Sequence, residues 1–430
     1  MTITPVEAHG DEGPDTSTID LSTLRWDEPS MWVDLDREAV FASMRLNEPV
    51  LWCEEPEVPG FPKGPGYWSL SRHADVMEVS RNPQRFVSGQ GTNIPDMPLE
   101  IAEFFGSMIN MDAPRHTRLR LIVNRAFTPR QVARIDADVA QKAEAIVNSV
   151  AERGECDFVT DIAARLPLEV ICEMMGIPPS QYQRMFELTN TILGAGDEEY
   201  TPDFLSLINA AVELSQMAQE IGRDRLANPT DDLTSALMHA EVEGEDGTIQ
   251  RLTSEELGSF FILLAAAGNE TTRNAISHGM YALSTHPEQR RLLTADFEGV
   301  IPTAVEEIVR WATPVIHFRR TATEDCELGG KSIAAGDKVV MWFNSADRDE
   351  SVFENPYRFD VARTPNEHVG FGAGGPHFCL GANLARREIT VMFRELFRQL
   401  PDIEITGEPD YLQSIFIHGI KRMPCAFTPR

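Results

Sequence analysis

A cysteine at the end of a glycine-rich loop is the residue with the most evident chemistry. Residues 370–381 read Gly-Phe-Gly-Ala-Gly-Gly-Pro-His-Phe-Cys-Leu-Gly, with four glycines in the first six positions. Such a run predicts a backbone that bends tightly or lies close to a flat partner. Cys379 immediately precedes residues 382–400, which have helical spacing. The free N–H groups and the dipole at a helix N-terminus favour a thiolate.

The residues around Cys379 limit which metal or cofactor its thiolate could bind. No further Cys or His at zinc spacing accompanies it, which argues against a structural zinc site. A single thiolate suits the axial position of a haem iron. The alternative is a buried free cysteine in a glycine-rich loop, and the loop alone leaves both interpretations open.

A second stretch with chemical potential lies in the middle of a long predicted helix, residues 253–285. Thr253 followed by Glu256 forms a capping-box pattern at its start. About 32 residues at 1.5 Å each give a length of nearly 50 Å. Residues 260–268 are apolar all round and should be buried, whereas residues 269–274 read Asn-Glu-Thr-Thr-Arg-Asn. Polar groups on a buried helix are costly unless partnered, so these form either an internal network or a site.

The spacing of apolar residues along the rest of the chain predicts a mainly α-helical fold with small β-sheets. No internal repeat or linker divides the chain, so we expect a tail of residues 1–25 that is flexible and poor in large apolar groups, followed by one domain, residues 26–430. Strand-like runs lie at residues 50–53, 67–70 and 339–343. Besides the long helix, helical spacing covers residues 114–127, 129–153, 160–175, 203–227 and 382–400.

Composition excludes several classes of protein. The 430 residues include 38 Lys and Arg against 67 Asp and Glu, a net charge of −29 that repels the phosphates of nucleic acids. The longest apolar run, residues 260–267, is far shorter than the roughly 18 residues that cross a bilayer. Residues 1–24 contain no Lys or Arg and no signal-peptide pattern, and the six cysteines are scattered without a CxxC pair. We therefore expect a cytoplasmic protein with no transmembrane segment.

The cysteine loop and four further motifs, in order across residues 111–381, resemble the cytochrome P450 family of haem–thiolate monooxygenases. Residues 307–310 read Glu-Ile-Val-Arg, similar to the ExxR helix motif of that family, and Arg363 matches the third member of its charged cluster. Residues 267–272, Ala-Gly-Asn-Glu-Thr-Thr, resemble the oxygen-activation stretch of its central helix. The resemblance implies a single-domain cytochrome P450 fold, a triangular prism with a long central helix over the haem. Glu307, Arg310 and Arg363 would be structural.

The resemblance also implies which residues hold the cofactor, haem b (iron protoporphyrin IX). Cys379 matches the axial ligand of the iron. The other cofactor-binding positions are the propionate partners His116, Arg120, Arg320 and His377, together with Phe371, Gly268 and Gly381.

One departure from the family pattern lies in the cysteine loop. The usual loop has a Phe seven residues before the cysteine, whereas Phe371 lies eight before Cys379. A one-residue insertion around Gly375 and Pro376 would explain this. The longer loop resembles that of actinobacterial members acting on sterol side chains and methyl-branched lipids. Residues 174–178, 269–279 and 416–421 look similar to that group too.

The resemblance assigns the catalytic roles to the central helix. Thr271 would hydrogen-bond oxygen or an ordered water, Glu270 would relay protons inward, and Gly268 would leave room for oxygen. Because Leu263, Ala267 and Thr271 are spaced by four, they share one helical face. The other candidates for the substrate pocket come by analogy and are Phe105, Ile109, Val315 and Phe416. All are uncharged, which favours a long apolar substrate entering end-on.

The expected reaction is hydroxylation of a terminal (omega) methyl with O2. The substrate would be a methyl-branched fatty acid or isoprenoid, or alternatively a sterol side chain (cholesterol or cholestenone). Electrons would come from a ferredoxin and an NAD(P)H-dependent ferredoxin reductase. A basic patch for an acidic ferredoxin could be formed by Arg115, Arg118, Arg120, Arg125, Arg130, Arg386 and Arg387. The remaining alternatives are a peroxygenase and a non-catalytic haem- or lipid-binding protein.

Overall fold

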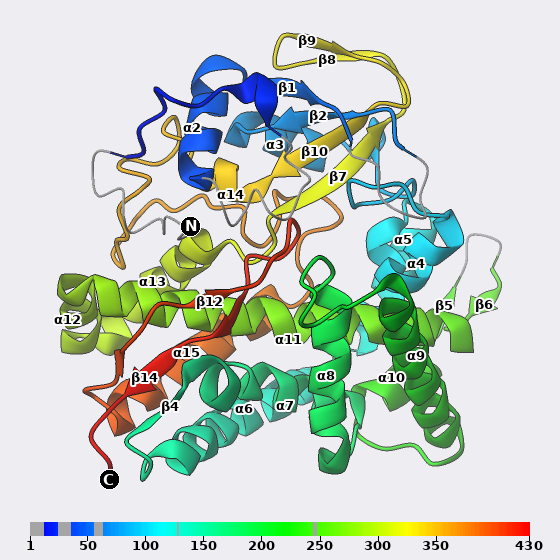
Figure 1. The fold of residues 1–430 in the computed structure, drawn as a ribbon. Helices are drawn as coiled ribbons and strands as arrows, with labels where there is room; N and C mark the ends of the chain where they lie inside the picture. The colour runs from blue at the N-terminus through cyan, green and yellow to red at the C-terminus, as the bar shows by residue number, and fades with distance from the viewer. Residues whose placement is uncertain (1–12, 25–35, 56–62, 127–128, 244–246) are drawn as a thin grey trace.

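The helix predicted over residues 253–285 runs through the middle of the molecule. In this computed structural model it is α11 (Ser254–Thr285), which crosses the helical part below the largest sheet (Figure 1). The hydroxyl of Thr253 accepts the N–H of Glu256 at 3.1 Å, and the Glu256 carboxylate accepts the N–H of Thr253 at 2.9 Å. The predicted capping box is therefore confirmed, and it satisfies N–H groups that a helix start leaves free.

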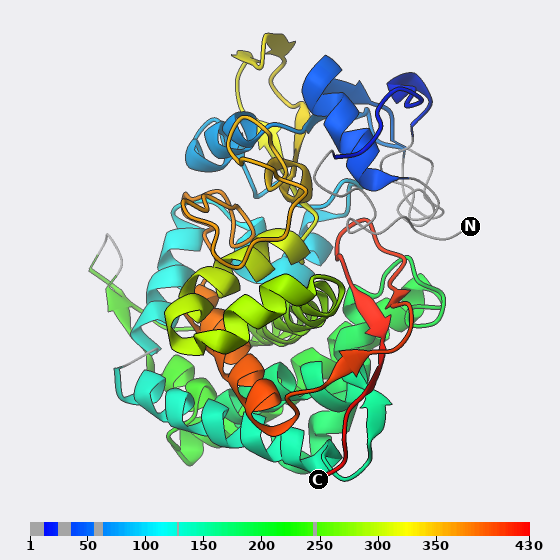
Figure 2. The same ribbon diagram turned by 90° about the vertical axis from the view of Figure 1, so that its left-hand side faces the viewer.

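Other helices pack around α11 and share one large hydrophobic core with it. Figure 2, which looks nearly along α11, shows helices on several sides of it. The helices predicted at residues 114–127, 129–153, 203–227 and 382–400 are confirmed to within three residues at each end. The helices that contribute to this core include α4 (Leu99–Gly106), α5 (Arg115–Ala126), α6 (Pro129–Val150), α7 (Arg165–Met175), α8 (Tyr182–Leu193), α9 (Phe204–Ala227), α10 (Leu233–His239), α13 (Phe297–Ala312) and α15 (Ala382–Gln399).

The segment predicted as one helix over residues 160–175 is divided in two. A π-helical turn, η5 (Val159–Ala163), precedes α7, and the N–H of Ala164 donates to the carbonyl of Val159 at 2.8 Å. Pro167 explains the break, because its ring clashes with the carbonyl four residues earlier in a regular helix. Within the first turn of α7 its missing N–H is tolerated.

The predicted strands form the largest sheet, at the top of Figure 1. Its order is β1-β2-β10-β7-β3, with β10 parallel to β2 and the other pairs antiparallel. The runs predicted at residues 50–53 and 67–70 match β1 and β2, and that at 339–343 is displaced by one residue. The bounds are β1 (Val50–Cys53), β2 (Tyr67–Leu70), β10 (Lys338–Trp342), β7 (His317–Ala322) and β3 (Phe86–Val87).

The remaining elements are short or lie at the periphery. A three-stranded sheet has the order β11-β14-β4, and the pairs β12-β13, β5-β6 and β8-β9 form hairpin-like sheets. Their bounds are β4 (Glu155–Asp157), β5 (Val242–Glu243), β6 (Ile249–Gln250), β8 (Cys326–Leu328), β9 (Lys331–Ile333), β11 (Glu404–Ile405), β12 (Asp410–Tyr411), β13 (Ile420–Arg422) and β14 (Pro424–Ala426). The other helices are η3 (Leu21–Thr23), α2 (Arg37–Asn47), α3 (His73–Arg81), η4 (Ser107–Asn110), η6 (Pro179–Gln181), α12 (Pro287–Ala295) and α14 (Phe343–Ala346).

The structure describes residues 13–24, 36–55, 63–126, 129–243 and 247–430. The predicted flexible tail, residues 1–25, is described only over residues 13–24. In its described part, Ile19, Leu21 and Leu24 pack against the apolar cluster between α2 and the sheet. The tail as a whole is poor in large apolar residues, but these three side chains contribute apolar surface to the cluster.

Among the described residues, no helix combines the length and apolar character that a membrane span needs. All six cysteines lie in described segments, and none of them forms a disulfide.

Candidate active site

Cys379 lies at the junction between the glycine-rich loop and α15. Its N–H donates to the carbonyl of Phe371 at 3.0 Å, which closes the loop, and Gly381 is the N-cap of α15. Burial raises the pKa of the Cys379 thiol, while the N–H groups of Gly381 and Ala382 and the guanidinium of Arg120 act in the opposite direction. The chain thus places hydrogen-bond donors and positive charge around this sulfur, an environment that favours a thiolate bound to a cation.

The turn that contains Gly374 and Gly375 lies against α3. Gly374 and Gly375 both have positive φ, and a Cβ on Gly375 would lie 2.3 Å from the carbonyl oxygen of Ser80. The Ser80 hydroxyl donates to the carbonyl of Gly374 at 2.9 Å. Only glycine fits a left-handed turn that approaches another backbone so closely. Phe371 nevertheless remains hydrogen-bonded to Cys379 through its carbonyl, and the guanidinium of Arg386 lies 4.4 Å from its ring centroid.

Two predicted propionate partners are brought together from distant parts of the chain. The rings of His116, on α5, and His377, in the cysteine loop, have centroids 4.4 Å apart. The hydroxyl of Ser88 lies 3.1 Å from Nε2 of His377, whereas Nε2 of His116 is buried without a hydrogen-bond partner. Burial, assisted by the charge of Arg320, lowers the pKa of His377 to about 2. Burial also lowers the pKa of His116.

The two predicted arginines join this cluster. Nη2 of Arg120 donates to the carbonyl of Phe378 at 2.8 Å, and Nη1 of Arg320 donates to the carbonyl of Arg319 at 2.8 Å. Burial lowers the pKa of Arg320 to about 10. Within the described part of the chain, no carboxylate forms an ion pair with either guanidinium.

Arg320 is 5% exposed and Arg120 is half-buried. A buried cation without a carboxylate is costly, so the cluster suits an anionic group from outside the chain. The two propionates of a haem would supply that charge. The cluster and the donors around the Cys379 sulfur therefore fit the cofactor that the resemblance implies.

One face of α11 is open at the centre of the helix. Ala267 is exposed and Leu263 and Thr271 are half-buried, although most residues on either side of them are buried. The Thr271 hydroxyl donates to the carbonyl of Ala267 at 2.8 Å. Gly268 has a different environment, because a Cβ there would lie 3.2 Å from Cδ1 of Ile171 on α7. The absence of a side chain at Gly268 thus allows α7 to approach α11 closely. The open face is formed by Leu263, Ala267 and Thr271, which are spaced by four.

The polar residues that follow the apolar centre of α11 form an internal network. Glu270 and Arg273 make an ion pair, and both side chains are at most 2% exposed. Nη1 of Arg273 donates to Asn190 of α8 at 2.8 Å, and Nδ2 of Asn274 donates to Glu270 at 3.1 Å. Glu270 therefore faces Arg273 and α8, whereas Thr271 lies on the open face. Oε2 of Glu270 is buried without a hydrogen-bond partner.

The predicted pocket residues come from three other segments. Phe105 lies on α4 and Ile109 on η4, and both elements contact α11; Val315 precedes β7, and Phe416 lies in the C-terminal segment. The N–H of Ile316 donates to the carbonyl of Phe416 at 2.8 Å, which holds the last two segments together. All four predicted side chains are half-buried.

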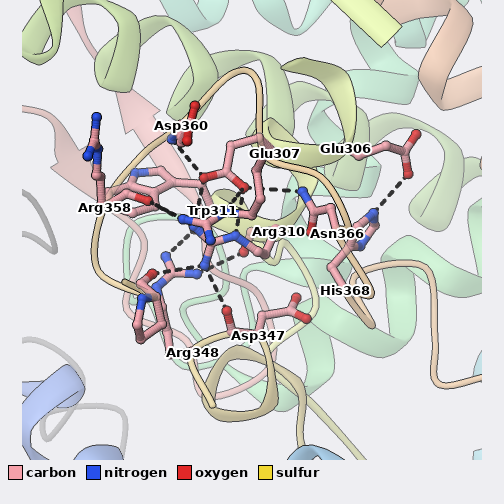
Figure 3. A network of polar contacts seen from close by, with 12 residues as sticks. Glu306, Glu307, Arg310, Trp311, Asp347, Arg348, Arg358, Asp360, Asn366 and His368 are labelled. Carbon is pink, nitrogen blue, oxygen red and sulfur yellow. Dashed lines mark hydrogen bonds and ion pairs between the residues drawn. The ribbon is translucent and has the colours of Figure 1, made fainter. Parts of the chain in front are cut away.

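The ExxR motif has the geometry expected from its spacing. Glu307 and Arg310 are one turn apart on α13, both side chains are 0% exposed, and their closest ion-pair distance is 2.7 Å (Figure 3). Nε of Arg363 lies 3.1 Å from the Glu307 carboxylate, and Asn366 also donates to it. Burial would raise the pKa of Glu307, but the charges of Arg310 and Arg363 outweigh it and the pKa is lowered.

Sequence reasoning missed several buried groups around this cluster. Arg348, which is 2% exposed, donates to the carbonyls of Arg310 and Trp311 at 3.0 and 2.9 Å (Figure 3). Asp347 accepts the N–H of Val369, at the start of the cysteine loop, at 2.7 Å. These residues lie outside regular elements, so periodicity gives no signal for them.

Glu388 of α15 was also missed, although the sequence carries a signal for it. Its side chain is buried, it interacts with the hydroxyl of Thr272 on α11, and burial raises its pKa to about 8. Residues 388, 392 and 396 share the buried face of α15, so helical spacing places an acid among apolar residues. Glu388 is therefore a neutral carboxylic acid at neutral pH.

Three of the seven arginines of the predicted basic patch are paired with glutamates. Arg115, Arg118 and Arg386 form ion pairs, with Glu103 at 2.5 Å, Glu256 at 2.6 Å and Glu306 at 2.6 Å respectively. The side chains of Arg125 and Arg130 lie outside the described residues. In the sequence, residues 111–130 hold five arginines against Asp112, a local charge of +4. This sum overstates the local charge, because the acidic partners come from other parts of the chain.

Comparisons with known proteins find relatives in both sequence and structure. The family model described as "Cytochrome P450" matches residues 199–401. The chain is 52% identical over 395 residues to the methyl-branched lipid omega-hydroxylase of Mycobacterium tuberculosis, covering 91% of each protein. It is 41% identical over 392 residues to the steroid C26-monooxygenase of Mycolicibacterium smegmatis, covering 90% of each. A Mycobacterium marinum cytochrome P450 solved with pseudoionone superimposes with a TM-score of 0.88 at 42% identity, over 96% of this chain and 100% of that one.

Proposed function

The chain belongs to the cytochrome P450 family of monooxygenases, and we propose that it hydroxylates the terminal methyl of a methyl-branched fatty acid or isoprenoid. The observation that carries this proposal is the 52% identity, over 91% of both chains, to a relative named for that reaction. The uncharged residues along the open face of α11 support an apolar substrate. A sterol side chain is the second candidate, because steroid C26-monooxygenases match over a similar length at 41% identity.

Residues of this chain are suited to hold haem b. Cys379 would ligate the iron through its thiolate, and the N–H groups of Gly381 and Ala382 would moderate the charge on the sulfur. The cluster of His116, Arg120, Arg320 and His377 would bind the two propionates through charge-assisted hydrogen bonds. When bound, the haem supplies the oxidation of an unactivated C–H bond by O2 and two electrons.

The residues of α11 would position oxygen and protons. The Thr271 hydroxyl, which donates to the Ala267 carbonyl at 2.8 Å, can turn to donate to oxygen or an ordered water at the open face. Glu270 would move a proton through Oε2, its oxygen without a partner, once the carboxylate turns away from Arg273. The Glu270–Arg273 ion pair thus holds the acid in its resting position.

The pocket side chains would select a substrate by shape and by exclusion of water. Leu263 and Ala267 on α11, Phe105 on α4 and Phe416 in the C-terminal segment present apolar surface. Burying a hydrocarbon chain against such surface is favourable by roughly 0.8 kcal/mol for each CH₂ group. A long chain that enters end-on would place its terminal methyl, rather than an internal carbon, near Thr271.

Electrons for the reaction would come from a ferredoxin and an NAD(P)H-dependent ferredoxin reductase. Because Arg115, Arg118 and Arg386 are paired with glutamates, the attraction for an acidic ferredoxin would be local and modest.

Reconstitution of the full-length holoenzyme tests the proposed function. The enzyme is supplied with ferredoxin, reductase, NADPH and a methyl-branched fatty acid, with a straight-chain acid of equal carbon number as the matched control. We expect an omega-hydroxylated product, formed faster from the branched acid and absent without NADPH. Faster turnover of cholestenone would favour the sterol alternative. Product formed only with added hydrogen peroxide would indicate a peroxygenase, and binding without product would indicate a ligand-binding protein.

A further inference from the structure

Two of the six cysteines lie opposite each other on neighbouring strands, far from the candidate active site in the sequence. Cys156 on β4 and Cys425 on β14 are register partners in an antiparallel pair. Their Sγ atoms are 3.4 Å apart, and Cys425 also lies within 3.4 Å of the carbonyl oxygen of Cys156. No sequence motif brings them together, because they are separated by 269 positions.

The backbone holds the two thiols in this arrangement independently of their own contact. On one side of the pair, the N–H of Phe158 donates to the carbonyl of Met423 at 2.8 Å. On the other side, the N–H of Phe427 donates to the carbonyl of Gly154 at 2.9 Å. Directly opposite residues of antiparallel strands have Cα atoms about 4.5–5.5 Å apart, within the range that a disulfide spans. A bond between the two sulfurs therefore needs only a small side-chain movement.

Cys156 and Cys425 differ from the other cysteines in the short distance between their sulfurs, and the two differ from each other in solvent exposure. All six cysteines are described, and no other two have sulfurs within hydrogen-bonding distance of each other. Cys156 is half-buried and can be reached by a small oxidant, whereas Cys425 is only 2% exposed. The hydrogen bond with the Cys425 sulfur and burial raise the pKa of Cys156, so oxidation of Cys156 proceeds through a small thiolate fraction.

We propose that Cys156 and Cys425 are a modification site that hydrogen peroxide converts to a disulfide. Peroxide first oxidises Cys156 to a sulfenic acid and is itself reduced to water. The Cys425 thiol then attacks that sulfur, the S–S bond forms, and a second water leaves. In sum, two thiols lose two electrons and two protons, and one peroxide becomes two waters.

The disulfide would tie the C-terminal segment to the helical part. It closes a loop of most of the chain and so restricts the unfolded state, which stabilises the native fold. The same segment continues from β13, where the N–H of Ile420 donates to Asn274 of α11 at 3.1 Å. In the oxidised form, the C-terminal segment that carries Phe416 would therefore detach less readily from the helical part.

A peptide mass map of the full-length holoenzyme tests this site. The protein is treated with a small excess of hydrogen peroxide, quenched with catalase, alkylated with iodoacetamide and digested without reductant. We expect one cross-linked peptide pair joining Cys156 to Cys425, a rise in Tm of several degrees, and reversal of both by dithiothreitol. The Cys156→Ser and Cys425→Ser variants should show neither change, and Cys172→Ser should behave as the wild type.

Alkylation of both cysteines after treatment would overturn the proposal, as would sulfinic acid at Cys156 or a disulfide to any other cysteine. The mass map of the wild-type protein decides this even if a serine variant fails to fold. Because the readout is a covalent bond, it does not depend on which substrate the enzyme oxidises.

Discussion

The carboxylate of Glu270 forms an ion pair with Arg273, one turn further along α11, and both side chains are almost completely buried. The adjacent Thr271 instead donates to the Ala267 carbonyl on the open face of the helix. Two neighbouring residues that the family resemblance assigns to one task are thus held in different environments. Their contributions can therefore be separated by mutation.

The Thr271→Ala variant should consume NADPH without forming a matching amount of product. Without the hydroxyl, no side chain at this position of the open face donates a hydrogen bond to oxygen, so we expect peroxide release and unchanged cofactor binding. The measurement is the ratio of product and of peroxide to NADPH consumed. Thr271→Ser, which keeps the hydroxyl, is the control and should remain coupled. Equal coupling in the alanine variant and the wild type would show that Thr271 has another role.

The Arg273→Met variant should lower the free energy of unfolding by about 3–5 kcal/mol, because it leaves the buried Glu270 carboxylate without its cation. Replacing both partners, Glu270→Gln with Arg273→Met, should restore most of this loss. Urea unfolding of the two single variants and the double variant gives the coupling energy. Additive effects would mean that the ion pair contributes nothing to the fold.

The stability of the protein should depend on pH through Glu388. Its pKa is raised from 4.5 to about 8 by burial, so the folded state binds more protons than the unfolded state between these values. Stability therefore falls as the pH rises from about 4.5 to 8, by up to ~4 kcal/mol. In Glu388→Gln this part of the decline should vanish, as measured by urea unfolding across that pH range. Parallel curves for the two proteins would contradict the assignment.

The Ala267→Leu variant should bind branched substrates more weakly. Ala267 is the most open residue at the centre of α11, and three further carbons would occupy space that the substrate needs. We expect a smaller substrate-induced spin-state shift and a KM raised by at least about tenfold, which corresponds to 1.4 kcal/mol. The spectrum of the reduced, carbon monoxide-bound protein should be unchanged, which controls for damage to the cofactor site. An unaltered KM would place the substrate elsewhere.

Residue spacing over a few positions correctly predicted the long helices and the geometry of the motifs. The Thr253–Glu256 capping box and the Glu307–Arg310 pair each depend on residues within one turn, so their geometry follows from spacing alone. Strands β1 and β2 were also predicted because their apolar runs are short and bounded. The Pro167 break was overlooked, although the rule for proline in a helix would have indicated it.

Contacts between distant segments could not be predicted in the same way. The glutamates that neutralise Arg118 and Arg386 lie more than 70 positions away in the sequence, so a local charge sum overestimated the basic patch. The register of Cys156 with Cys425 and the burial of Arg348 likewise depend on how whole segments pack. Propensity and periodicity carry no information on such pairings.

The absorption spectrum of the reduced, carbon monoxide-bound protein tests the central claim most directly, namely that the Cys379 thiolate holds a haem. The wild-type protein should show the long-wavelength Soret band typical of thiolate ligation, and Cys379→Ser should lose it, while Cys172→Ser should keep it. A wild-type protein without that band after expression with ample haem precursor, or a Cys379→Ser variant that retained it, would contradict the account.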